Sequence, residues 1–190
     1  MGRYMSEHSP QKWFNLEERF FKDMDQQLLA RLKEQQQLEQ SAESIMQVTG
    51  ITDKDLAEEI AKLNVSVETL SAFRLVPLVA VAWADDRIDS SERFEITKAA
   101  EQTGIQADDP AMTMLNAWTE RRPGPELLDA WCDYTRSLCG SINEQQRHVL
   151  KQEVLRQVRA VAEATGGMLG FGSVSPSEQA TINRIDEALS

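Results

Sequence analysis

Two stretches of this chain follow the same order of residue types, and they constrain the fold more than any other feature. Residues 81–92 and 161–178 each contain the apolar end of a helix, a turn, one aliphatic residue and a second helix start. The second start reads Asp-Ser-Ser-Glu at 89–92 and Ser-Pro-Ser-Glu at 175–178. This is the spacing of a capping box, in which a cap side chain and a glutamate satisfy each other's backbone amides. The repeat predicts two helix–turn–helix hairpins packed around a pseudo-twofold axis.

The rest of the chain also shows helical periodicity, interrupted by the residues that start and stop helices. Gly and Pro total only 15 residues, which disfavours a β-sandwich. Apolar residues at three- and four-residue spacing, with cap, Pro and Gly signals, predict the following helices: 11–40, 41–48, one opening at 52–55, 67–84 with a kink or restart at Pro77, 90–102, one starting at Pro110, 126–139, 143–164 and a last helix from 176. The predicted fold class is an all-α, compact helical bundle of two pseudo-symmetric hairpins plus additional helices.

The first 64 residues are predicted to form a separate N-terminal helical extension, followed by a helical domain over 65–190. The long helix 11–40 carries one apolar stripe, formed by Trp13, Leu16, Phe20, Met24, Leu28 and Leu32. A heptad frame from Phe14 places Glu17, Arg31 and Gln35 at core positions, which argues against a coiled coil. We therefore expect this helix to dock along the domain, with a scaffold or dimerisation role for it as the alternative.

Charge and cysteine content limit the partners. The formal net charge is −11, which repels phosphate backbones and argues against a nucleic-acid partner. No apolar run is long enough to span a membrane, and the expected location is cytoplasmic. Cys132 and Cys139 lie two turns apart on a predicted helix, too far for a disulfide, and are expected to be reduced thiols. With two histidines in the chain, a Cys/His zinc site is implausible.

The acidic turn after residue 84 invites comparison with a calcium loop. An EF-hand loop has oxygen ligands at positions 1, 3 and 5, glycine at 6 and glutamate at 12. Counted from Asp85, the third position is Arg87, the sixth is Ser90, and Glu92 comes too early. The sequence therefore excludes an EF-hand.

Residues 82–92, Ala-Trp-Ala-Asp-Asp-Arg-Ile-Asp-Ser-Ser-Glu, resemble the signature of the TerB-like family, which is associated with tellurite resistance. The Gly-Gly loop followed by Ser-Pro-Ser-Glu near the end of the chain is similar to the second half of that signature. The resemblance covers about residues 66–190. It implies an all-helical domain, cytoplasmic or peripherally membrane-associated, that binds a divalent metal and acts in chemical-stress assemblies rather than as an enzyme. The metal ligands it implies are Asp85, Asp89, Glu92 and Glu178.

This chain departs from the family pattern at two positions. Asp86 stands at a glycine position, where an aspartate tolerates a left-handed backbone better than most residues. Thr165 stands where the first loop has Asp85, so the second loop offers only Glu178 at a matched position. Capping alone also accounts for the acids of both boxes, and it is the favoured interpretation. If a metal binds, oxygen ligands favour a Ca²⁺- or Mg²⁺-like ion over zinc.

Other candidate sites are weaker. The glycine-rich loop 166–172 lacks a lysine and is not a phosphate loop; we expect it to fold over the core rather than expose Leu169 and Phe171. The tryptophans Trp83, Trp118 and Trp131 are expected in the core, and His148 on the surface without a catalytic triad. The expected function is that of a non-catalytic, TerB-like module that binds a protein partner. The alternative is a metal-dependent hydrolase using Asp85, Asp89 and Glu92.

Overall fold

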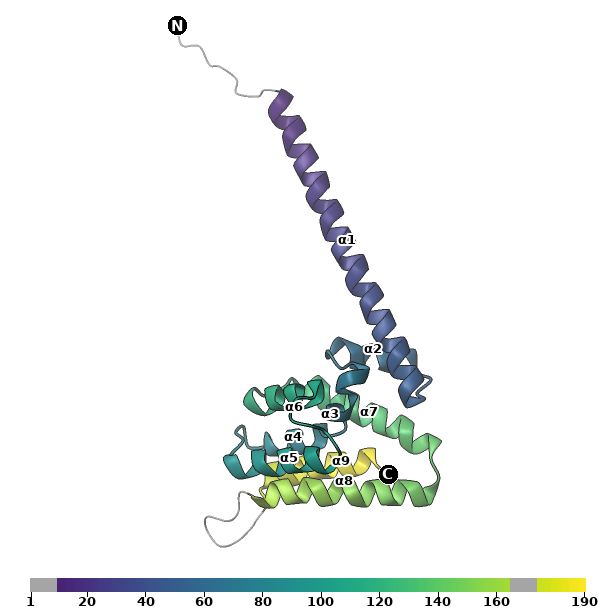
Figure 1. Cartoon of the computed structure of the whole chain (residues 1–190), viewed down its shortest axis with the longest axis vertical. Coiled ribbons are helices and arrows are strands. Elements are labelled where there is room, and N and C mark those ends of the chain that lie inside the picture. Colours follow the sequence, from purple (N-terminus) through teal and green to yellow (C-terminus); the bar gives the residue numbers. More distant parts are fainter. Residues whose placement is uncertain (1–9, 165–173) are drawn as a thin grey trace. The chain divides into compact units, whose positions relative to one another are not determined.

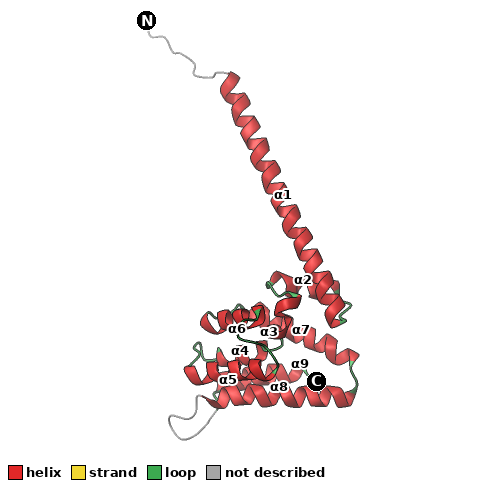
Figure 2. Cartoon of the chain, viewed as in Figure 1, coloured by secondary structure: helices red, strands yellow, loops and turns green. Residues whose placement is uncertain are grey.

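The computed structural model describes residues 10–164 and 174–190, and throughout this part of the chain the regular structure is helical, without strands (Figures 1 and 2). The elements are α1 (Pro10–Thr49), α2 (Lys54–Lys62), the 3₁₀ turn η1 (Val67–Thr69), α3 (Leu70–Phe73), α4 (Val76–Ala82), α5 (Ser90–Gln102), α6 (Pro110–Glu120), α7 (Pro125–Ser141), α8 (Glu144–Ala164) and α9 (Pro176–Ala188). The all-α prediction is confirmed.

The chain forms two units, Met1–Gln40 and Ser41–Ser190. The predicted helices 11–40 and 41–48 are one continuous helix, α1, which ends at Thr49 before Gly50 in the left-handed conformation (φ 77°). Ser41 is no helix breaker, so backbone hydrogen bonding continues while the buried face begins. The second unit includes α2, since Ile45, Leu56 and Ile60 are buried and α2 packs on α7. The compact unit thus begins at Ser41 and not at the predicted residue 65.

In the first unit, five large apolar side chains of α1 are exposed, Phe20, Met24, Leu28, Leu29 and Leu32, while Leu38 is half-buried. Trp13 and Leu16 of the predicted stripe lie outside the described side chains. The structure does not place this unit relative to the second, so docking of the helix along the domain stays a prediction.

Helix α4 is the centre of the second unit, as its nearly continuous apolar sequence predicts. It contacts α5, α7, α8 and α9. Pro77 does not kink one long helix; instead η1 and α3 end before it, and α4 restarts with Pro77 in its first turn, where no backbone donor is needed. The two predicted hairpins, α4–α5 and α8–α9, pack on each other, because α8 contacts α4 and α5 while α9 contacts α4 (Figure 1).

The core side chains come from every helix of the second unit. The largest that are fully buried include Phe73, Leu78, Ile96, Leu115 and Ile185. Trp131 is buried as predicted, whereas Trp83 and Trp118 are half-buried and are joined by a 2.8 Å hydrogen bond from the Trp83 indole N–H to the Trp118 carbonyl. Cys132 and Cys139 are free and buried, as predicted, and burial raises the pKa of both thiols.

Candidate functional site: the joint between the two hairpins

The first hairpin turns through an acidic segment at residues 85–89. Asp86 has φ 70°, a left-handed backbone that an aspartate tolerates better than most residues. The Asp85 carboxylate accepts a hydrogen bond from the Arg87 amide at 3.4 Å and pairs with Arg87 Nε at 3.6 Å. Asp86 forms an ion pair with Arg122, which begins the segment before α7. Asp85, one of the predicted metal ligands, is thus partly exposed and is paired with the guanidinium of Arg87.

The capping box predicted at the start of α5 is present. Asp89 Oδ1 accepts hydrogen bonds from the amides of Ser91 (2.8 Å) and Glu92 (2.9 Å). Glu92 Oε2 in turn accepts from the Asp89 amide at 2.9 Å. Asp89 is therefore committed to capping, and its carboxylate satisfies amides that the first helical turn leaves without helical partners.

The second box at the start of α9 repeats this geometry. Ser175 Oγ accepts from the Glu178 amide at 3.2 Å, and Glu178 Oε2 accepts from the Ser175 amide at 2.6 Å. Thr165 and the glycine-rich loop 166–172 lie outside the described residues, so the second turn itself is not compared with the first.

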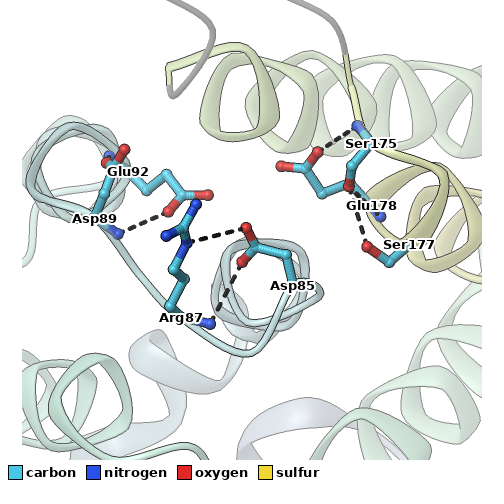
Figure 3. Close-up of polar contacts among 7 residues, drawn as sticks. All are labelled: Asp85, Arg87, Asp89, Glu92, Ser175, Ser177 and Glu178. Carbon is cyan, nitrogen blue, oxygen red and sulfur yellow. Dashed lines mark hydrogen bonds and ion pairs between the residues drawn. The ribbon is translucent and has the colours of Figure 1, made fainter. Parts of the chain in front are cut away.

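The two box glutamates are unusual in their burial. Glu92 is 3% exposed and Glu178 6%, and among the described Asp, Glu, Lys, Arg and His side chains they are the two that are buried. Figure 3 shows their carboxylates, together with that of Asp85, directed toward the space between the end of α4 and the starts of α5 and α9. Burial of a charged group is costly unless charges or hydrogen bonds compensate. Each glutamate accepts a cap hydrogen bond, and both carboxylates lie where water reaches only slightly.

The charges at the joint leave a negative balance. Asp85, Asp89, Glu92 and Glu178 are opposed by Arg87, and the N-termini of α5 and α9 each add about half a positive charge, which leaves a local charge of about −2. Within residues 10–164 and 174–190, however, no three His, Cys, Asp or Glu side chains are gathered closely enough to hold a metal ion. The four predicted ligands thus do not form a single metal-binding cluster in the part of the chain that the structure describes, and a cation at the joint stays a prediction.

A groove lies next to the joint and was not predicted from the sequence. It has a volume of about 660 Å³ and is bordered by α4, the segment before α7, α7 and α9. Ala84 and Ser177, which flank the two turns, belong to its lining. The sequence of residues 121–125 predicts only a turn, and nothing in the sequence around Arg184 signals a site. The groove depends on which helices pack together.

The cap of α5 gives a direct test of the local structure. Replacing Asp89 with Ala removes the acceptor for two amides and should lower the free energy of unfolding by about 0.5–2 kcal/mol. Replacing Asp89 with Asn keeps an acceptor oxygen and should lower the free energy of unfolding by only a few tenths of a kcal/mol, on the order of the small differences among good caps. Urea denaturation measures both, and equal losses for the two variants would contradict the hydrogen-bonding role.

His148 is exposed, as predicted, and lies on α8.

No helix within the described residues is long and apolar enough to cross a membrane.

Comparison of the chain with family models, with curated proteins and with solved structures finds no match in any of the three.

Proposed function

We propose that this chain is a non-catalytic, TerB-like helical module that holds a divalent cation at the joint between its two hairpins and binds a protein partner. The observation that carries the cation is the pair of buried glutamates, Glu92 and Glu178, whose carboxylates face a common space (Figure 3). The link to a chemical-stress response of the tellurite type rests on the resemblance of residues 82–92 to the TerB-like signature alone.

One feature supports a cation beyond what capping requires. Capping needs a glutamate at each helix start, but it does not need the two helix starts to face each other. Both carboxylates are directed toward a common space where solvent access is low, and a divalent cation in that space would bind both (Figure 3). The ligands are carboxylate oxygens, so the expected ion is a hard one, Mg²⁺ or Ca²⁺ before Zn²⁺. When bound, it would be held by Glu92 and Glu178, with Asp85 nearby.

The hydrolase alternative has less support from the geometry. Of its three proposed carboxylates, Asp89 accepts two backbone hydrogen bonds and Asp85 pairs with Arg87. His148, a residue type suited to acid–base catalysis, is an exposed residue of α8. No described contact joins these carboxylates to a nucleophile.

Thermal unfolding tests the cation proposal. At a free Mg²⁺ or Ca²⁺ concentration about a hundred times the dissociation constant, binding should stabilise the native state by about 2.7 kcal/mol. For a chain of this length that raises the unfolding midpoint by about 5–10 °C. Glu92→Gln and Glu178→Gln keep an amide oxygen for the cap hydrogen bond but lose the charge, so each should remove most of the rise.

The matched control is Glu101→Gln, an exposed glutamate of α5, which should keep the full rise. Potassium chloride at equal ionic strength separates binding from the general screening of an acidic protein. A midpoint that moves no more with Mg²⁺, Ca²⁺ or Zn²⁺ than with potassium chloride would refute the proposal.

A further inference from the structure

The groove beside the joint has an apolar floor. Its apolar lining includes residues that are almost fully buried, Val76, Val79 and Leu127, and others that are half-buried or exposed, Ala84, Leu128 and Ala180. Its volume of about 660 Å³ lies within the range of binding pockets. Because several lining residues, including Ala180 and Arg184, are exposed, it is an open groove rather than an enclosed cavity.

The charge of the groove is opposite to that of the chain. Its described lining contains Arg122 and Arg184 but no Asp or Glu, although the whole chain carries a net charge of −11. Arg122 pairs with Asp86 and Arg184 with Asp129, carboxylates that do not line the groove. A guanidinium has five N–H donors in a planar fork, so each arginine retains donors for a ligand while holding its partner.

We propose that this groove binds an amphipathic helical segment of a partner protein, with apolar residues on one face and Asp or Glu beside them. The floor would bury the apolar side chains, and Arg122 and Arg184 would bind the flanking carboxylates. This mode of recognition, a helix laid in an apolar groove with its anchors three and four residues apart, is common in protein complexes.

The geometry favours a protein segment over a small amphipathic anion, since small-molecule sites enclose most of their ligand and this groove is open. This inference does not depend on the cation at the joint.

A displayed library of helical peptides with randomised faces tests the proposal, with the full chain as target and EDTA present throughout. The selected peptides should carry apolar residues at helical spacing next to Asp or Glu. Fluorescence anisotropy measures the binding. A selected peptide should bind at least about tenfold more tightly than a copy with Lys in place of its acidic residues, a difference of about 1.4 kcal/mol in binding free energy.

Two variants assign the binding to the groove. Arg122→Gln with Arg184→Gln should reduce the preference for the acidic peptide to less than about threefold, a fraction of one charged hydrogen bond. Ala180→Trp fills the groove from an exposed position of α9 and should weaken both peptides. Circular dichroism and the unfolding midpoint confirm that each variant is folded.

Several results would overturn the proposal. They are the absence of any enriched apolar–acidic peptide, an acidic preference that survives loss of both arginines, and binding that Ala180→Trp leaves unchanged. Tight binding of laurate without peptide binding would assign the groove to a small anion instead. Self-association in sedimentation that Ala180→Trp abolishes would assign it to a second copy of the chain.

Discussion

Replacing Phe73 with Ala should lower the free energy of unfolding by about 3–5 kcal/mol, the largest single effect expected in this protein. Phe73 is 0% exposed, and its ring meets that of Tyr134 edge to face, with centroids 5.8 Å apart and planes at 67°. The change removes the buried apolar surface, the aromatic contact and the packing that surrounds the ring, so a cavity remains where α3 meets α7.

Phe94→Ala is the matched control, because Phe94 is 64% exposed on α5 and its truncation should change stability by no more than about 0.5 kcal/mol. Urea denaturation of both variants at neutral pH gives the comparison. Equal losses for Phe73→Ala and Phe94→Ala would show that the core is not organised around α3 and α4.

Replacing Ile185 with Ala should cost about 2–5 kcal/mol. Ile185 is 0% exposed on α9, the helix that packs against α4, α7 and α8. Because α9 carries Glu178 at its start, loosening its packing also loosens the joint, so this variant should show a smaller rise of the unfolding midpoint with Mg²⁺ than the unchanged chain.

Ile185→Val provides the graded control: it removes one methyl group and should cost about 0.5–1.5 kcal/mol, with the cation response retained. Chemical denaturation gives the stabilities and thermal scans give the response to Mg²⁺. A full rise of the unfolding midpoint with Mg²⁺ in a destabilised Ile185→Ala protein would show that cation binding does not depend on the packing of α9.

Local signals predicted much of this fold from the sequence. The box at residues 89–92 predicted a helix over 90–102, and α5 has those bounds. Pro110 and Pro176 begin α6 and α9, and Gly50 follows the end of α1. These signals work because they act over three or four residues, where the backbone amides of a helix start and the left-handed residue after a helix end are settled locally.

The errors came where local propensity and tertiary packing give different answers. The sequence predicts a separate short helix at 41–48, closed by Thr49 and Gly50, yet no residue at its start stops the preceding helix, and α1 is continuous to Thr49. The compact unit begins within α1, and its first buried residues are Ala42 and Ile45.

The candidate sites also show which features are local in the sequence and which depend on tertiary packing. The residue types at the joint could be named from the sequence, but their burial and the facing of Glu92 and Glu178 depend on how α5 and α9 pack. The groove was missed altogether, because Arg122–Asp86 and Arg184–Asp129 join residues 36 and 55 positions apart. Contacts of such separation follow from helix packing and have no local sequence signal.

The most direct measurement of the central proposal is anomalous diffraction from crystals grown with Mn²⁺, an ion that takes carboxylate ligands as Mg²⁺ does. We expect an anomalous peak between the carboxylates of Glu92 and Glu178 that is absent from crystals of the Glu92→Gln, Glu178→Gln double variant. A joint without such a peak, with the two glutamates ordered and only their cap hydrogen bonds present, would contradict it and leave the pair as capping residues alone.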